Sequence, residues 1–186
     1  MGRVTPSGMT HEPGNGGSSE WYTPPWLFEH LGLNFDLDPC APPAPAAPWI
    51  PADERISLPD DGLRIEWEGR VWLNPPYGDQ TARWVKRLEE HGDGVALVFA
   101  RVDTGWSQSA LAAADAVCFV RGRVEFSPGP GAIVRRSDGR SRSGAPSMLL
   151  AFGEVCASAL ERSGLGVCFR DPIVYTPQLS MDEAAA

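Results

Sequence analysis

Short apolar runs alternate with helically spaced apolar positions along most of this chain. The runs lie at residues 34–38, 71–73, 95–99, 116–120 and 147–152, and a weaker apolar segment follows near 167–169. Helical spacing marks residues 26–31, after Thr23 as the expected N-cap, and also 80–91, 106–114 and 154–162. Strands that alternate with helices predict an α/β sandwich built on a mainly parallel sheet.

The two ends of the chain differ in composition from its middle. Residues 1–18 are rich in Gly, Ser and Pro, which predicts a flexible arm, and residues 179–186 are expected to form a flexible tail. Residues 19–178 are long enough for one domain with its own core. Within that domain, the Pro-, Ala- and Asp-rich residues 42–60 are expected to form an ordered loop.

Charge is distributed unevenly along the sequence. The chain carries a net charge of −8, and only one of its 16 basic residues, Lys86, is a lysine. This acidic net charge argues against a protein that binds nucleic acid mainly through its overall charge. Residues 121–143 nevertheless contain six arginines and two acidic residues, a local charge of +4. This segment is therefore a candidate basic patch for transient contact with nucleic acid.

The four cysteines and three histidines show no metal-binding spacing. Because no C-x-x-C pair is present, we expect no metal, and we expect the cysteines to be reduced and buried. The sequence shows neither an apolar leader nor a run of about 18 apolar residues that would span a membrane. We therefore expect this chain to act in the cytoplasm, without a membrane partner.

Two of the expected strands end in unusual polar sequences. Residues 38–41 read Asp-Pro-Cys-Ala and follow the first strand, and residues 74–77 read Asn-Pro-Pro-Tyr and follow the second. In α/β folds, ligands bind beyond the carboxyl ends of parallel strands. We therefore expect the chemistry of this protein at these two strand ends.

The sequence Asn74-Pro75-Pro76-Tyr77 is the most specific signal in the chain. Two successive prolines remove two backbone donors, so the turn presents carbonyl groups. The Asn74 side-chain oxygen and the Pro75 carbonyl offer two acceptors to an exocyclic amine, and Tyr77 offers a ring on which a planar base stacks. The lone pair of adenine N6 is delocalised into its ring, and two acceptors would direct it at a sulfonium methyl for in-line displacement. A base within a duplex would have to flip out to reach this turn.

Other interpretations of this turn stay open. A proline-rich turn capped by an aromatic residue also serves packing alone. The same turn also suits methyl transfer to adenine in RNA or to a protein glutamine amide. A protein that had lost catalysis would retain only nucleic-acid binding. A metal-dependent nuclease is disfavoured, because the acidic residues near 36–61 lack basic partners at a recognisable spacing.

Three sequence blocks occur in an order that is typical of one enzyme family. They are residues 21–24 (Trp-Tyr-Thr-Pro), 35–41 (Phe-Asp-Leu-Asp-Pro-Cys-Ala) and 72–77 (Trp-Leu-Asn-Pro-Pro-Tyr), and shorter pieces follow at 101–106, 122–126 and 145–148. With these blocks the chain resembles the phage-type DNA N6-adenine methyltransferase (Dam) family over about residues 20–153. The resemblance implies a single-domain Rossmann-like sheet with an antiparallel C-terminal strand, S-adenosylmethionine as the cofactor and DNA adenine as the substrate. It also implies a phage or restriction-modification setting inside a bacterial host.

The resemblance further implies roles for single residues. Asp38 would meet the methionyl end of the cofactor, and Asp61 would contact its adenine. The usual glycine-rich loop is absent, since residues 40–43 read Cys-Ala-Pro-Pro. Taken alone, Asp38 is also explained as a strand-end aspartate, Asp61 as a surface-turn residue and Thr23 as a helix cap. The expected catalytic residues are Asn74, Pro75, Pro76 and Tyr77, and the expected cofactor-binding residues are Trp21, Tyr22, Thr23, Pro24, Asp38, Pro39, Cys40, Ala41 and Asp61.

Arginines are the expected DNA contacts, because guanidinium groups suit phosphates and guanine edges. Alternatively, these arginines are simply charged residues of a solvent-exposed loop. For Arg101, an ion pair with Asp103 at a helix start is a second alternative. With no separate recognition domain evident, sequence recognition is expected from loops 42–60 and 121–146, and no motif predicts the recognition site or an oligomeric state. The candidate arginines are Arg101, Arg121, Arg123, Arg135, Arg136, Arg140 and Arg142.

Overall fold

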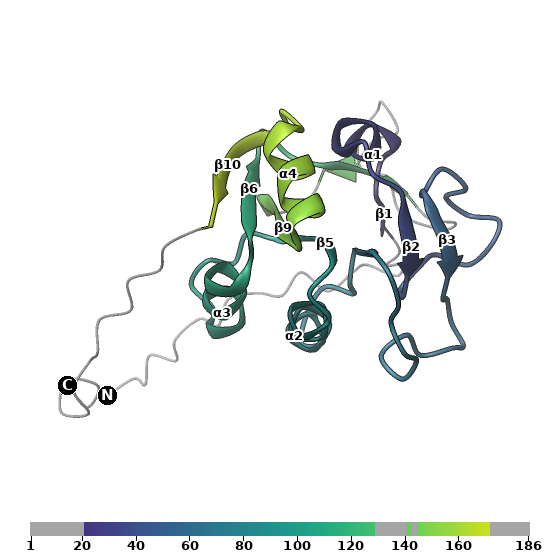
Figure 1. The fold of residues 1–186 in the computed structure, drawn as a ribbon. Coiled ribbons are helices and arrows are strands. Elements are labelled where there is room, and N and C mark those ends of the chain that lie inside the picture. Colours follow the sequence, from purple (N-terminus) through teal and green to yellow (C-terminus); the bar gives the residue numbers. More distant parts are fainter. Residues whose placement is uncertain (1–20, 129–140, 143–144, 172–186) are drawn as a thin grey trace, which may run out of the picture.

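A computed structural model describes residues 21–128, 141–142 and 145–171 of the chain (Figure 1). These residues form two sheets and four helices. The strands are β1 (Trp21–Tyr22), β2 (Phe35–Asp38), β3 (Ala52–Arg55), β4 (Val71–Leu73), β5 (Gly94–Phe99), β6 (Ala116–Val120), β7 (Glu125–Pro128), β8 (Ser141–Arg142), β9 (Ser147–Phe152) and β10 (Gly166–Arg170). The helices are α1 (Pro25–Leu31), α2 (Thr81–His91), α3 (Gly105–Ala113) and α4 (Glu154–Arg162).

The larger sheet has seven strands in the order β10-β6-β9-β5-β4-β2-β3. Strands β3, β2, β4 and β5 run parallel to one another. Strand β9 lies antiparallel between β5 and β6, so these two also share one direction. Five parallel strands therefore end at one edge of the sheet, which we call the carboxyl edge.

Helices cover both faces of this sheet (Figure 1). On one face, the side chains of α1 and α4 pack with Phe35, Trp72 and Leu149. On the other face, the side chains of α2 and α3 pack with Leu73 and Val98. Strand β9 is buried at all six positions, because it lies in the middle of the sheet with a helical layer on either side.

The helices begin and end where local chemistry allows. In α2, Trp84, Val85 and Leu88 recur at helical spacing and are buried, and Gly92 ends the helix in a left-handed conformation with its N–H bonded to the Leu88 carbonyl. Helix α1 ends in the same way at Gly32. The prediction that Thr23 caps α1 was wrong, because the N-cap is Pro24 and no side chain bonds the helix start.

A second, three-stranded sheet has the order β1-β7-β8, and its strand pairs are antiparallel. The side chains of β1 and β7 both reach the main core, since Tyr22 and Phe126 belong to the same buried cluster as Trp72. This sheet therefore connects the N-terminal block of the sequence to the arginine-rich segment, two regions about one hundred residues apart.

The structure corrects three further expectations. Residues 42–60 are not entirely a loop, because β3 lies within them and pairs with β2 in parallel. The segment 121–146, expected as a loop, contains strands β7 and β8. Two C-terminal strands rather than one run antiparallel, because the apolar segment near 167–169 forms β10, which pairs antiparallel with β6. In the described ranges, no helix combines the length and apolarity that a membrane span requires.

Candidate active site

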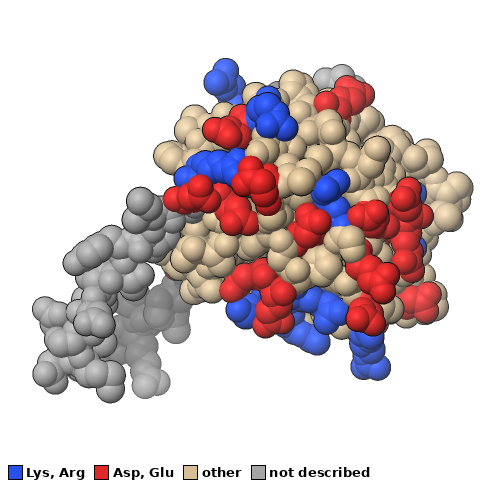
Figure 2. Space-filling view, in the orientation of Figure 1, with Lys and Arg blue, Asp and Glu red and all other residues tan. Residues whose placement is uncertain are grey.

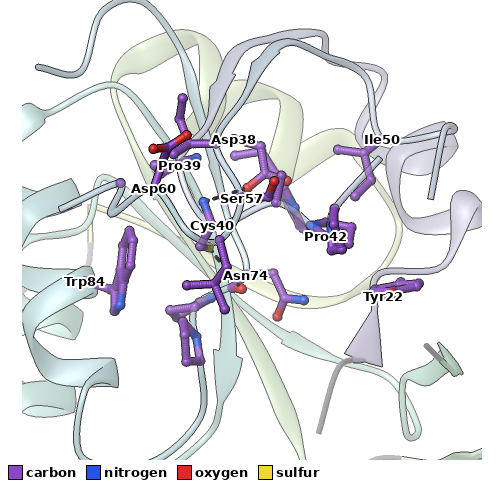
Figure 3. Close-up of a pocket in the computed structure, with 18 of the residues that line it drawn as sticks. Tyr22, Asp38, Pro39, Cys40, Pro42, Ile50, Ser57, Asp60, Asn74 and Trp84 are labelled. Carbon is purple, nitrogen blue, oxygen red and sulfur yellow. Dashed lines mark hydrogen bonds between the residues drawn. The ribbon is translucent and has the colours of Figure 1, made fainter. Parts of the chain in front are cut away.

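The two polar strand ends meet at the carboxyl edge of the larger sheet. Strands β2 and β4 are neighbours and parallel, so Asp38 and Asn74, at their carboxyl ends, both line one pocket of about 580 Å³ (Figure 3). Trp84 lies on one side of them and Tyr22 and Ile50 lie on the other (Figure 3). The lining residues are Tyr22, Thr23, Asp38, Pro39, Cys40, Ala41, Pro42, Pro43, Ile50, Ile56, Ser57, Leu58, Pro59, Asp60, Asp61, Gly62, Trp72, Asn74, Pro75, Pro76, Tyr77 and Trp84.

Asp38 is a carboxyl group that the fold removes almost completely from water. Only 2% of the residue is exposed, and burial raises the pKa of its carboxyl to about 7. The Cys40 backbone N–H donates to Asp38 Oδ1 over 3.2 Å, and nearby Arg55 also favours the charged form. A carboxyl with a pKa near neutrality is poised to ionise when a cation enters the pocket.

The turn at residues 74–77 is fixed by side-chain donors. The Cys40 thiol donates to the Asn74 carbonyl over 3.2 Å, and the Thr81 hydroxyl donates to the Pro76 carbonyl over 3.0 Å. The Pro75 carbonyl accepts no hydrogen bond from the described part of the chain. Of the three carbonyls, that of Pro75 is therefore the one left for a ligand in the pocket.

Tyr77 carries both a stacking surface and a hydrogen bond to the neighbouring amide. Its hydroxyl donates to Asn74 Oδ1 over 3.0 Å. One face of the Tyr77 ring is stacked on Phe99, with 3.9 Å between ring centroids and 7° between planes. Phe126 of β7 meets the ring edge-on at 6.3 Å. A planar ligand could therefore not stack on the ring face that Phe99 covers.

The N-terminal block reaches the pocket through Tyr22 and Thr23. Both residues are buried and line it, and Pro24 is buried at the start of α1. The Trp49 indole N–H donates to the Thr23 carbonyl over 2.9 Å, which holds the loop before β3 against this block. Thr23 Oγ1 is buried without a hydrogen-bond partner among the described residues. The backbone of Trp21 pairs with β7, and its side chain lies outside the described part.

The acidic turn at residues 60–62 lies over the end of β2. A Cβ added to Gly62 would overlap the Pro39 carbonyl, so only glycine permits this approach. The Trp67 indole N–H donates to the Gly62 carbonyl over 2.7 Å and fixes the turn from the other side. Asp61 is exposed, and its carboxylate accepts from the Leu63 N–H and pairs with Arg64. Asp61 therefore lines the pocket with a carboxylate that is already engaged locally.

We predict that Gly62→Ala displaces this turn and weakens binding of a pocket ligand at least about tenfold, because a methyl group cannot fit against Pro39. Gly105→Ala is the matched control, since its Cβ would meet nothing within 4 Å and its backbone is helical. Binding measured by tryptophan fluorescence checks the prediction. Equal affinities of the two variants would contradict it.

Sequence reasoning missed several pocket residues because their signals were ordinary. Trp84 falls in the helical pattern of residues 80–91 and Trp72 in the apolar run 71–73, yet both also line the pocket. Ile50, Ile56 and Ser57 lie in the Pro-rich stretch that was expected to be a loop. Only Gly62 carried a usable signal, as a glycine directly after two acidic residues.

The structure describes the side chains of three of the seven candidate DNA-binding arginines. Arg101 follows β5, and Arg121 and Arg123 follow β6, so these three exposed residues lie at the carboxyl edge, the same edge as the pocket. Arg101 forms no ion pair with Asp103. Figure 2 shows acidic and basic side chains intermixed on one face, without a continuous basic surface there. Arg135, Arg136, Arg140 and the side chain of Arg142 lie outside the described residues.

Comparison with known proteins identifies the family. The family model described as DNA N-6-adenine-methyltransferase (Dam) matches residues 15–163, a range that includes every described residue from β1 through α4. Comparisons with curated proteins and with solved structures give no match. Since the matched range covers most of the 186 residues, the chain belongs to the DNA N-6-adenine-methyltransferase (Dam) family.

Proposed function

We propose that this chain transfers a methyl group from S-adenosylmethionine to the exocyclic N6 of adenine in DNA. The observation that carries the proposal is the juxtaposition, in one pocket, of the Asp38 carboxyl and the Asn74–Tyr77 turn. The first is a partner for a cationic ligand, and the second offers acceptors and a ring to an amine on a planar base.

The pocket suits S-adenosylmethionine in size and chemistry. Its volume of about 580 Å³ lies within the range of small-molecule sites. Asp38 would hold the ammonium of the methionyl end, Tyr22 and Thr23 would border that end, and the turn at residues 60–62 would border the adenosine. When bound, the cofactor supplies an electrophilic methyl group on a sulfonium. The residues of this chain bind and orient it, and the proline-rich segment after β2 replaces a glycine-rich loop.

The acceptor side of the pocket is assigned to Asn74, Pro75 and Tyr77. Asn74 Oδ1 and the Pro75 carbonyl, which has no partner in the described part, would both accept from the N6 amine. Tyr77 would stack on the base, backed on its other face by Phe99. Such fixed acceptors favour reaction by aligning the amine and need no covalent enzyme intermediate.

A base inside a duplex cannot enter this pocket, so we propose that the target adenine is flipped out. Asp38 and Trp72, which line the pocket, are almost inaccessible, and this supports a reaction below the protein surface. The exposed arginines at the same edge would then hold the DNA backbone while the base enters.

We predict that Arg121→Gln combined with Arg123→Gln lowers DNA affinity and flattens its salt dependence. Each lost phosphate contact should reduce the slope of log K against log salt by about 0.9. Lys86→Gln, at an exposed position of α2, is the matched control. Fluorescence anisotropy with a DNA duplex at several salt concentrations checks this, and an unchanged slope in the double variant would refute the assignment.

The decisive experiment incubates the full chain with labelled S-adenosylmethionine and unmethylated DNA, RNA or protein, followed by nucleoside and amino-acid analysis. N6-methyladenine in DNA is the expected product. Label in RNA adenine or in a glutamine amide alone would reassign the acceptor. Cofactor binding without transfer to any of the three would indicate a catalytically silent homologue.

A further inference from the structure

The double proline leaves the middle of the turn without backbone donors. Pro75 and Pro76 have no N–H, so they cannot donate main-chain hydrogen bonds that would tie the bend to a neighbouring strand. A turn that must place two acceptors within a fraction of an ångström therefore needs donors from elsewhere. The described structure provides one at each end of the turn.

At the first end, Cys40 connects the two strand ends that form the pocket. Its backbone N–H donates to the Asp38 carboxyl and its thiol donates to the Asn74 carbonyl, each over 3.2 Å. The thiol keeps its proton, because burial raises the pKa of Cys40 well above its ordinary value and the neighbouring Asp38 adds to the effect. Cys40 is a free cysteine and thus remains a hydrogen-bond donor.

At the second end, Thr81, the first residue of α2, ties the turn to that helix. Its hydroxyl is 3.0 Å from the Pro76 carbonyl, and the residue is 5% exposed, so water does not replace this bond easily. Helix α2 is packed against the sheet through Trp84, Val85 and Leu88, which makes it a rigid support.

We propose that Cys40 and Thr81 are positioning residues, which clamp the Asn74–Tyr77 turn from its two ends and hold its acceptors in register with Asp38. Neither side chain needs to touch the reacting atoms. This inference rests on the proposed methyl transfer, since the clamp matters only if the turn orients an amine. It assigns to Cys40 a role toward Asn74 rather than toward the cofactor alone.

The test measures steady-state transfer to DNA by the full chain and, separately, the dissociation constant for S-adenosylmethionine. Cys40→Ala and Thr81→Val should each lower kcat about tenfold, because a misplaced turn loses alignment. Both variants should keep cofactor affinity within about twofold of the unsubstituted chain, since neither alters Asp38. Cys40→Ser and Thr81→Ser restore a donor and should recover most of kcat.

Two control variants remove hydroxyl or thiol donors of the same kind away from the pocket. Cys168 and Ser163 both donate to the Leu160 carbonyl, over 3.4 and 2.7 Å, and Cys168→Ala and Ser163→Ala should leave kcat unchanged. If the alanine or valine variants fold poorly, the kcat values of the two serine variants are compared with those of these controls, and that comparison tests the clamp. Activity of Cys40→Ala equal to that of the unsubstituted chain, or a loss confined to cofactor affinity, would overturn the clamp. An inactive unsubstituted chain would instead overturn the proposed function.

Discussion

Asn74→Ala is expected to lower methyl transfer by about 10²- to 10³-fold while leaving the affinity for S-adenosylmethionine within about threefold. The substitution removes the side-chain acceptor of the turn, and deletion of one fixed polar group that acts on the reacting centre has effects of this size. It also removes the partner of the Tyr77 hydroxyl, which lies 3.0 Å from Asn74 Oδ1. The Asn74 main chain, which accepts the Cys40 thiol, stays in place.

Transfer kinetics with saturating DNA and a separate cofactor titration measure these two quantities. Asn34→Ala is the matched control, because Asn34 is exposed before β2 and far along the strand from the pocket. Retention of more than about a tenth of the activity by Asn74→Ala would contradict the role assigned to the turn. A parallel collapse of cofactor affinity would instead indicate a general distortion of the pocket.

Asp38→Asn is expected to weaken cofactor binding at pH 8 by about a hundredfold or more, because a buried carboxylate loses its charge opposite an ammonium group. In the unsubstituted chain, binding should also depend on pH. Burial raises the pKa of Asp38 to about 7, so below pH 7 a proton must leave before the cation is held. Affinity should therefore fall as pH decreases through 7, by up to about tenfold per pH unit.

For the same carboxyl we predict that stability changes with pH in the opposite direction to cofactor affinity. Its pKa in the folded state exceeds the value of about 4 in the unfolded chain, so the folded state binds the proton more tightly. The contribution of Asp38 to stability is then greatest below pH 4, decreases as pH rises from about 4 to about 7, and changes no further above 7. Asp38→Asn abolishes this loss and should stabilise the chain without ligand at pH 8 by on the order of 4 kcal/mol.

Calorimetric titration of the cofactor and thermal unfolding, both from pH 5 to pH 8.5, measure the two effects. Asp53→Asn on exposed β3 removes a carboxylate from the surface and serves as the control. A cofactor affinity that stays level across pH 7 would show that Asp38 does not hold the cation. Equal stability of Asp38→Asn and the unsubstituted chain at pH 8 would show that its carboxylate is not costly in the fold.

The elements of the larger sheet could be predicted from the sequence where pattern and burial agree. Residues 71–73, 116–120 and 147–152 are short apolar runs that both neighbouring layers bury, and the structure confirms these strands at the same residues. The polar sequences at Asp38 and Asn74 were correctly placed at strand ends, and the pocket brings them together. Strand β3 escaped prediction because Asp53 and Glu54 are exposed on an edge strand, which needs no apolar signal.

By itself, therefore, the sequence determined the helices and most strands of the larger sheet, the family blocks and the turn whose prolines remove backbone donors. Only the tertiary structure decided which distant residues meet at that turn. The Cys40 thiol donates a hydrogen bond to the carbonyl of Asn74, 34 positions away in the sequence. Phe99 stacks on Tyr77, and Gly62 lies against Pro39. The physical reason is that period and propensity act within one segment, whereas these contacts depend on strand order and on the close approach of separate loops.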